Sequence, residues 1–311
     1  MRSPSCSVPP VPRRPEAGTL SQTVHLLANP SARLGGAAAR IEDVDAALQH
    51  RGREVVHLSA DDAEGARAAA ASLVQEGADR LIVIGGDGMV HLAVQALATS
   101  DITMGVLPFG TGNDFAGALG LPTDLDQAID RALAPATPVD LMRIGDQWAA
   151  SVATLGFSVD VNARANMMRW PSGSSRYTLA TLRELPSLRT RTYSVDIDGT
   201  MYELPAVLLT VANTSDFGGG MRISPQADPA DGLLDLTVVG ATGRLELLRW
   251  FRKVFDGSHL DHPSVTTLRG RTVTISAPDA ALWADGEPVT TTPTQIEAVP
   301  GALQLAGVAP T

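Results

Sequence analysis

Two short glycine-rich segments each follow an apolar run that is typical of a buried strand. Gly85-Gly86-Asp87-Gly88 comes directly after Leu81–Ile84. Gly110–Asn113 comes shortly after the run Met104–Leu107. A turn from a strand into a helix presents free backbone N–H groups and the positive end of the helix dipole, and both attract phosphate. Glycine also lets the backbone approach a phosphate closely, because it has no Cβ. The two segments therefore predict an anion site.

Asp87 is unusual in such a turn, because a carboxylate repels phosphate. The presence of Asp87 is explained if a Mg²⁺ ion lies between its carboxylate and the phosphate, or if Asp87 exchanges a proton with the substrate. For one loop alone, a tight turn with a capping aspartate is the better interpretation, because short glycine motifs have many false positives. The chain has no G-x-x-x-x-G-K-[ST], no G-x-G-x-x-G after its first strand, and no H-R-D or D-F-G. A P-loop enzyme, a dinucleotide oxidoreductase and a protein kinase are thereby disfavoured.

The elements that would position these loops alternate along the first part of the chain. The predicted strands are Thr23–Asn29, Arg53–Leu58, Leu81–Ile84 and Met104–Leu107. The predicted helices include Ile41, Val44 and Leu48 at helical spacing, then Asp61–Gln75 and about Met89–Thr99. Strands that alternate with helices indicate a parallel sheet covered by helices on both faces.

The pattern changes after about Pro138, where one strand-like run follows another. These runs are Val139–Ile144, Trp148–Thr154, Tyr193–Ile197, Ala206–Asn213, Leu233–Val239, Thr272–Ser276 and Thr294–Val299, interrupted by helical patterns near Arg176–Leu185 and Arg244–Val254. Such a succession is typical of an antiparallel sandwich. We therefore expect a disordered leader over residues 1–20, an α/β domain over 21–138 and an all-β sandwich domain over 139–311.

Composition excludes several other classes of protein. The chain has 24 basic and 34 acidic side chains, a net charge of −10, which is the wrong sign for a nucleic-acid partner. Its 44% hydrophobic content is that of a globular protein. Cys6 is the single cysteine and can form no internal disulfide. No run reaches the ~18–20 apolar residues of a membrane helix, and the Pro-rich leader does not match a secretory signal. We expect a cytoplasmic protein.

Several segments, taken in order, resemble the diacylglycerol kinase catalytic family, which includes sphingosine kinases, ceramide kinases and bacterial lipid kinases. The matching segments are Asn29-Pro30-Ser31, Gly85–Gly88, Leu107–Phe115, Asp231–Asp235 and Asp285-Gly286-Glu287-Pro288. They span about Val24 to Pro300, nearly the whole predicted structured chain. The resemblance implies a nucleotide-binding domain like that of NAD kinase and diacylglycerol kinase, followed by a lipid-substrate domain. It also implies that the γ-phosphate of ATP is transferred to the hydroxyl of a lipid such as diacylglycerol.

The resemblance also implies roles for individual residues. ATP would contact Asn29, Ser59, Gly85, Gly86, Asp87, Gly88, Met89, His91, Gly110, Thr111 and Asn113. Glu287 would be the catalytic carboxylate, with Asp285 as a second candidate. Asp228, Asp231 and Leu233 would hold a structural Mg²⁺, although without the resemblance a strand-entry turn would be preferred there. The family commonly has threonine and asparagine where this chain has Met89 and His91.

A segment between Asn162 and Arg191 mixes cationic and apolar residues. Its arginines are Arg164, Arg169, Arg176, Arg183, Arg189 and Arg191, and they alternate with Met167, Met168, Trp170, Tyr177, Leu179, Leu182 and Leu185. This mixture suits a surface that rests on anionic lipid. An amphipathic helix that packs its leucines on the β domain is an equally good interpretation. Peripheral contact with the inner face of the plasma membrane and a homodimer both stay open.

Two other functions remain open at this point. An NAD kinase or phosphofructokinase relative shares the GGDG turn, but the Asn113-Asp114-Phe115 and Asp285–Pro288 segments favour a lipid kinase. A catalytically silent member that binds nucleotide or lipid is suggested by Met89, and it is opposed by the retained carboxylates. The identity of the lipid cannot be read from the residues: diacylglycerol, a sphingoid base and other lipid alcohols all fit.

Overall fold

The computed structural model describes residues 23–28, 36–110, 112–168, 170 and 174–309. The predicted leader and the predicted contacts of Asn29, Thr111 and Arg169 therefore lie outside the described residues. None of the described helices is long and apolar enough to cross a membrane.

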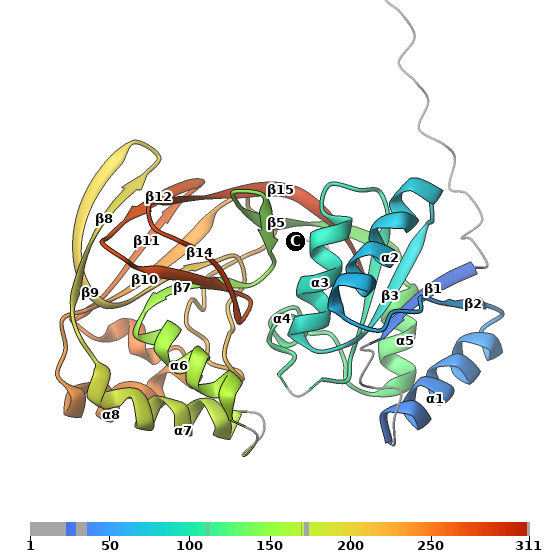
Figure 1. Ribbon diagram of the computed structural model, residues 1–311, viewed down its shortest axis with the longest axis horizontal. Coiled ribbons are helices and arrows are strands. Elements are labelled where there is room, and N and C mark those ends of the chain that lie inside the picture. Colours follow the sequence, from blue (N-terminus) through green and yellow to red (C-terminus); the bar gives the residue numbers. More distant parts are fainter. Residues whose placement is uncertain (1–22, 29–35, 111, 169, 171–173, 310–311) are drawn as a thin grey trace, which may run out of the picture.

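The N-terminal part is a parallel sheet of four strands in the order β2-β1-β3-β4. The strands are β1 (Thr23–Ala28), β2 (Glu54–His57), β3 (Arg80–Gly85) and β4 (Thr103–Pro108). The helices are α1 (Gly36–His50), α2 (Ala63–Glu76), α3 (Asp87–Leu97), α4 (Asp114–Ala118) and α5 (Leu125–Leu133), and they flank the sheet (Figure 1). The expected α/β architecture is confirmed.

Strand β3 shows why this sheet needs helices on both faces. Leu81 and Val83 pack with residues of α2 and α3, whereas Ile82 and Ile84 pack with residues of α1 and α5. Successive side chains of a strand point to opposite faces, so a run that is apolar at every position must be buried on both. All four side chains are buried, which explains the continuous apolar run in the sequence.

The C-terminal part is mostly β. Its strands are β5 (Ala136–Ile144), β6 (Gln147–Ala149), β7 (Val152–Gly156), β8 (Arg191–Ile197), β9 (Thr200–Ala212), β10 (Leu234–Gly240), β11 (Val265–Gly270), β12 (Thr272–Ser276), β13 (Ala281–Ala284), β14 (Glu287–Thr291) and β15 (Thr294–Ala306). Within this part, neighbouring strands pair antiparallel. The expected β-rich domain is thereby confirmed, although β5 spans the predicted limit at residue 138.

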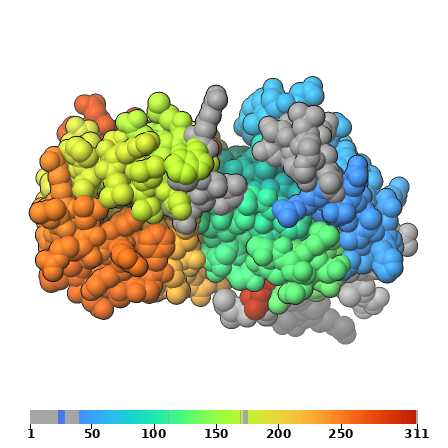
Figure 2. All heavy atoms as spheres, turned by 90° about the horizontal axis from the view of Figure 1, so that it is seen from below, coloured from blue at the N-terminus to red at the C-terminus, as the bar shows by residue number. Residues whose placement is uncertain are grey.

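Helices cover one side of the β-rich part. They are α6 (Phe157–Met167), α7 (Ser174–Glu184) and α8 (Arg244–Phe251), with short 3₁₀ turns at Leu185–Ser187, Arg252–Phe255 and Ser258–Asp261. Apolar residues of all three helices form one cluster with residues of β9 and β10. Figure 2 shows the yellow-green residues of α7 beside the orange residues around α8 on one face.

Strand β15 joins the two parts. It pairs antiparallel with β5 and β12, and near its end Gln304 and Leu305 pair parallel with β4. The backbone N–H of Thr99, just after α3, also donates to the carbonyl of Ala302 over 2.7 Å. The sequence predicted a strand only over Thr294–Val299. The strand is longer because its second half completes the edge of the N-terminal sheet.

Other sequence predictions were wrong in detail. The single strand expected over Trp148–Thr154 is interrupted between β6 and β7, where Ala150 and Ser151 turn their N–H groups toward Asp285. Helix α6 and strands β11, β13 and β14 were not expected. The N-cap of α2 is Asp62, whose side chain accepts from the Gly65 N–H over 2.8 Å.

Candidate active site

A cleft of about 790 Å³ lies between residues of the two parts. On the N-terminal side it is lined by Asp61, Asp62, Ala63, Gly86, Asp87, Gly88, Met89, Leu92, Gly110 and Gly112, and on the C-terminal side by Asn166, Arg176, Tyr177, Asp285, Gly286 and Glu287. The structure therefore brings both glycine loops together with the Asp-Gly-Glu turn. The N-terminal glycine loops form one wall of the cleft, and the Asp-Gly-Glu turn, which is far away in the chain, forms part of the other wall.

The two glycine loops touch each other through their backbones. A Cβ on Gly110 would lie 2.5 Å from the backbone nitrogen of Gly86. A Cβ on Gly112 would lie 2.5 Å from Oδ2 of Asp87. Real Cβ atoms do not come so close to other heavy atoms, so a larger residue at Gly110 would push the two backbones apart, and one at Gly112 would displace the Asp87 carboxylate. Glycine is required here for close approach, and the first turn of α3 is left open to a ligand.

Asn113 shapes the second loop. Its backbone has φ 60°, a left-handed conformation that asparagine tolerates better than most residues. Its side-chain oxygen accepts from the Gly110 N–H over 3.1 Å, and its amide nitrogen donates to the carbonyls of Pro108 (2.9 Å) and Gly110 (3.1 Å). The predicted nucleotide residue Asn113 thus fixes the loop backbone from within.

Asp87 is the first residue of α3, where a negative charge interacts favourably with the helix dipole. Its Oδ1 accepts from the backbone N–H of Phe115 over 3.0 Å, which ties the two loops together. Its Oδ2 has no hydrogen-bond partner among the described residues. The side chain therefore keeps one oxygen for a ligand in the cleft.

Asp285 and Gly286 form the two-residue turn between β13 and β14. Both have positive φ, 52° and 85°, as a type I′ hairpin requires, and Asp-Gly is a favoured sequence for it. The carboxylate of Asp285 is 3% exposed and accepts three hydrogen bonds. The donors are the N–H groups of Ala150 (2.9 Å) and Ser151 (2.8 Å) and His91 Nδ1 (3.0 Å). This arrangement anchors the turn, and Glu287, the next residue, lines the cleft.

His91 lies one turn after Asp87 on α3 and contacts the C-terminal part through Asp285. Burial lowers the pKa of His91, but the hydrogen bond and charge of Asp285, with the charge of Glu287, outweigh burial and raise it. One turn further, Gln95 exchanges hydrogen bonds with the backbone of Trp148 over 2.5 and 3.0 Å. The predicted nucleotide residue His91 therefore lies in the contact between the two parts and is not among the residues that line the cleft.

Asp114 makes a second contact between the parts, which sequence reasoning missed. Its carboxylate accepts from the backbone N–H groups of Gly219 (2.8 Å) and Gly220 (2.7 Å). Burial and the charge of Asp87 raise the pKa of Asp114 to about 6, against the lowering effect of those two N–H groups. The only available signal was its place between Asn113 and Phe115 in the quoted motif.

Two smaller cavities continue inward from the cleft. The first, of about 50 Å³, is polar at one end and includes Asp87, Asp114, Tyr177 and Asp285. The second, of about 60 Å³, shares Asn162 and Phe217 with the first. Its other lining residues are almost all apolar: Phe157, Ser158, Val161, Thr181, Leu208, Met221, Ile223, Val239, Leu247, Trp250, Phe251 and Val254. The two cavities thus adjoin each other, and their lining changes from carboxylates to apolar side chains.

The predicted Mg²⁺ loop is arranged around an arginine. Asp231 Oδ1 accepts from the Leu233 N–H over 2.9 Å, and its Oδ2 forms an ion pair with Arg269. Asp228 Oδ1 accepts from the Ala230 N–H over 3.1 Å. Within the described part of the chain, no group of three or more His, Cys, Asp or Glu side chains is placed to hold a metal ion. Arg269 supplies the positive charge here, and a Mg²⁺ in this loop stays a prediction.

The remaining predicted residues have different surroundings. Met89 is buried and lines the cleft, and a Cβ on Gly85 would lie 2.6 Å from its Cγ. Ser59 follows β2, is exposed, and is not among the residues that line the cleft. In the basic and apolar segment, Met167 and Trp170 are exposed, whereas Arg164 pairs with Glu184 over 2.5 Å.

Comparisons with known proteins agree with this arrangement. The model of the diacylglycerol kinase catalytic domain matches residues 23–144. The model of the YegS C-terminal NAD kinase beta sandwich-like domain matches residues 150–307. A diacylglycerol kinase of Mycobacterium tuberculosis (strain H37Rv) is 41% identical over 302 residues, which cover 94% of this chain and 96% of that protein. A diacylglycerol kinase of Bacillus subtilis (strain 168) is 30% identical over 218 residues, covering 67% and 71%.

The fold is also similar to that of a solved structure. The crystal structure of a diacylglycerol kinase from Bacillus anthracis (strain Sterne) superposes with a TM-score of 0.71 at 24% identity, covering 94% of this chain and 99% of that one. The two domain models together take in most of the described residues, and they meet at the cleft. The chain belongs to the diacylglycerol kinase catalytic domain family, as a diacylglycerol kinase-like lipid kinase with a YegS-type C-terminal domain.

Proposed function

We propose that the chain transfers the γ-phosphate of ATP to the hydroxyl of diacylglycerol in the cleft between its two parts. The observation that carries the proposal is a series of three hollows with shared walls: the cleft lined by the glycine loops and Glu287, the small cavity lined by Asp87 and Asp114, and the apolar cavity lined by residues of α6 and α8. The first suits phosphate and the last suits an acyl chain. The relatives named diacylglycerol kinase support this choice of acceptor.

The phosphates of ATP lie against the first turn of α3 and the second glycine loop. Gly86 gives the N-terminus of α3 no side-chain cap, and the Met89 N–H donates to the Gly86 carbonyl, so the N–H groups of Asp87 and Gly88 are the ones that can bind phosphate. Mg²⁺ fits this site, because Asp87 Oδ2 and the carboxylate of Glu287 have no partner among the described residues, and Mg²⁺ is usually bound by one or two carboxylates and the substrate phosphates. When bound, it neutralises charge on the transferred phosphate.

Glu287 is the residue that accepts the proton of the acceptor hydroxyl. It lines the cleft, and the turn that carries it is anchored through Asp285. Asp285 was a second candidate for this role, but all of its hydrogen bonds go to protein donors and it is nearly inaccessible. We assign Asp285 to positioning and Glu287 to proton transfer.

The acceptor lipid enters from the side of α6, α7 and α8. Its hydroxyl lies where Tyr177 and Gly286 line both the cleft and the small cavity, on the side of the cleft that Glu287 lines, and its acyl chain follows the apolar cavity lined by Leu247 and Trp250. Apolar lining with a few polar groups at one end is typical of sites for amphipathic ligands. A dinucleotide acceptor would leave that apolar surface unused, which favours the lipid.

The test compares Glu287→Gln with the matched control Glu76→Gln, an exposed position at the end of α2. The assay measures transfer of labelled phosphate from ATP to dioleoylglycerol, sphingosine or NAD, together with ATP affinity. We expect transfer to dioleoylglycerol, a loss of roughly 10²–10⁴-fold in kcat for Glu287→Gln, and an unchanged control. Transfer to NAD alone would exclude a lipid kinase. Normal turnover by Glu287→Gln would remove its role, and no transfer by wild type to any acceptor would indicate a silent member.

A further inference from the structure

Strand β7 points alternate side chains into the core of the β-rich part and toward the small cavity of about 50 Å³. Ala153 and Leu155 belong to the apolar cluster inside that part. Val152 and Thr154 are on the other side of the strand, and both line the small cavity. Buried strand positions are usually apolar, whereas Thr154 is polar and 2% exposed. Its hydroxyl therefore needs a partner.

Thr154 is the first of three buried threonines that form a row across neighbouring strands. Thr154 of β7 is paired with Thr210 of β9, and Thr210 is paired with Thr237 of β10. The hydroxyl of Thr210 donates to the carbonyl of Thr237 over 3.2 Å. The hydroxyl of Thr237 donates to the carbonyl of Ile223 over 3.0 Å and lies 2.8 Å from the hydroxyl of Ser224. The second and third threonines of the row thus have partners within the protein.

The hydroxyl of Thr154 has no hydrogen-bond partner among the described residues. Thr154 lines the small cavity, whereas Thr210 and Thr237 line neither the small cavity nor the apolar cavity. Nearly all buried hydroxyls in folded proteins are hydrogen-bonded, because an unpaired one costs free energy. The unpaired member of the row is therefore the one beside the cavity.

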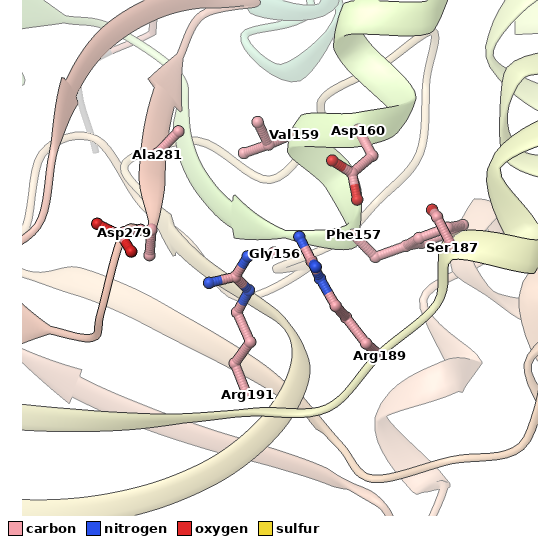
Figure 3. A pocket seen from close by; sticks show the side chains of 10 residues that line it. Gly156, Phe157, Val159, Asp160, Ser187, Arg189, Arg191, Asp279 and Ala281 are labelled. Carbon is pink, nitrogen blue, oxygen red and sulfur yellow. The ribbon is translucent and has the colours of Figure 1, made fainter.

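A second polar side chain lies where the two cavities meet. Asn162 lines both of them and is 6% exposed. Its side-chain amide makes no hydrogen bond with a described residue. Thr154 is in β7 and Asn162 is in α6, and Figure 3 shows the connection between these elements at Gly156 and Phe157. One short stretch of chain thus brings two unpaired polar groups to the same junction.

The junction lies between the two ends of the acceptor lipid. This placement rests on the proposed function, which puts the lipid hydroxyl near Tyr177 and Gly286 and the acyl chain in the apolar cavity. In diacylglycerol the group between these two ends is an ester, and its carbonyl oxygen can only accept hydrogen bonds. A threonine hydroxyl and an asparagine amide are both neutral donors. A carbonyl buried without a donor would lose free energy, so donors at this point favour a lipid that has an ester there.

We propose that Thr154 and Asn162 donate hydrogen bonds to the ester carbonyl of the acceptor lipid and thereby select acylglycerols over alcohols that lack an ester. A sphingoid base would bring an ammonium group to the junction instead. A buried ammonium is normally paired with a carboxylate, and neither residue supplies one. The apolar cavity accepts a hydrocarbon chain of any of these lipids, so the choice among them is made at the junction.

The test compares two acceptors that differ only in the carbonyl groups: dioctanoylglycerol and its diether analogue di-O-octylglycerol. Each is presented in detergent micelles at the same mole fraction, and the readout is the ratio of the two kcat/KM values. We expect the wild-type chain to prefer the ester by about tenfold, since one neutral hydrogen bond is worth roughly three- to tenfold. Equal use of both lipids would overturn the inference alone. Transfer to neither lipid would remove the proposed function, and the inference with it.

Variants locate the selection. Thr154→Val and Asn162→Leu should each lower kcat/KM for the ester by roughly three- to tenfold and leave the ether unchanged, because each removes one donor to the carbonyl. Thr154→Ser keeps the hydroxyl and should keep the preference. The ratio is measured within one preparation, so it does not depend on how much of a variant is folded. If Thr154→Val does not fold, Asn162→Leu gives the answer. An unchanged preference in the folded variants would overturn the inference.

The matched control is Thr210→Val, which removes the neighbouring hydroxyl of the same row. Thr210 has a hydrogen bond and lines neither cavity, so this variant should have a lower Tm and the wild-type ratio. Thr154→Val should not lower the Tm of the ligand-free chain, because the hydroxyl that it removes has no partner. A lower Tm for Thr154→Val would reveal a structural partner, and a changed ratio in the control would reveal a general effect of the sheet. Either result would overturn the assignment.

Discussion

Replacing Asp285 by asparagine tests whether the turn that carries Glu287 is held by charge-assisted hydrogen bonds. Asparagine suits the positive φ of 52° as aspartate does, so the backbone contribution is unchanged. One oxygen can still accept from Ser151, but the new amide NH₂ faces the N–H of Ala150. A lost hydrogen bond to a charged group is worth about 1.5–3 kcal/mol, and an unsatisfied buried N–H costs about 1–3 kcal/mol. We expect a loss of about 2–4 kcal/mol in the free energy of unfolding.

At about 2 °C per kcal/mol for a chain of this size, Tm should fall by roughly 4–8 °C. Differential scanning calorimetry measures this, with Asp146→Asn as the control, because Asp146 is an exposed turn residue whose side chain makes no hydrogen bond with a described residue. Lipid phosphorylation by Asp285→Asn should fall in kcat while the KM for ATP changes little, because Glu287 is displaced and the glycine loops are not. A variant with wild-type Tm and kcat would show that the three hydrogen bonds neither stabilise nor position the turn.

Three further predictions concern other contacts. The raised pKa of His91 means that its contribution to stability is fully present below its ordinary pKa near 6.5 and is lost as pH rises through the folded-state value. Denaturant unfolding should therefore show a larger deficit for His91→Gln at pH 6 than at pH 9, and an equal deficit would contradict this. Asp231→Asn removes the partly exposed pair with Arg269 and should cost up to about 1 kcal/mol. If the loop also binds Mg²⁺, adding Mg²⁺ should raise the Tm of the wild-type chain but not that of Asp231→Asn. Equal shifts in Tm for the two proteins would exclude a Mg²⁺ site in this loop. Trp170 is 79% exposed, so Trp170→Ala should weaken sedimentation with anionic vesicles without lowering Tm, and unchanged sedimentation would leave it no membrane role.

The N-terminal part could be predicted because its signals are local. Strand β3 is apolar at every position, and a glycine turn leads directly from it into α3. Strand, turn and helix thus follow one another between Arg80 and Leu97, so no distant contact was needed to recognise them. The Asp285-Gly286 pair is also a local signal for a turn, but the strands β13 and β14 on either side of it were not predicted.

Contacts between distant segments could not be predicted from the chain alone. His91 and Asp285 are 194 residues apart, and no sequence pattern around either residue indicates that they form a hydrogen bond. Asp114 and Gly219 are 105 residues apart, and that contact gives Asp114 its buried environment. Helix α6 was missed for another reason: Phe157, Val159 and Val161 are strand-favouring residues, and packing against β9 and α8 overrides that preference.

The path of β15 has a consequence for the order in which the protein folds during synthesis. β4 ends at Pro108, but its neighbour in the sheet at Gln304 and Leu305 emerges from the ribosome almost 200 residues later. Until then the edge of β4 offers unpaired N–H and C=O groups to other chains. The N-terminal sheet is therefore completed last although most of it is made first, and a nascent chain stalled before β15 would be prone to aggregation. A separately supplied peptide with the sequence of β15 should rescue such a truncated chain.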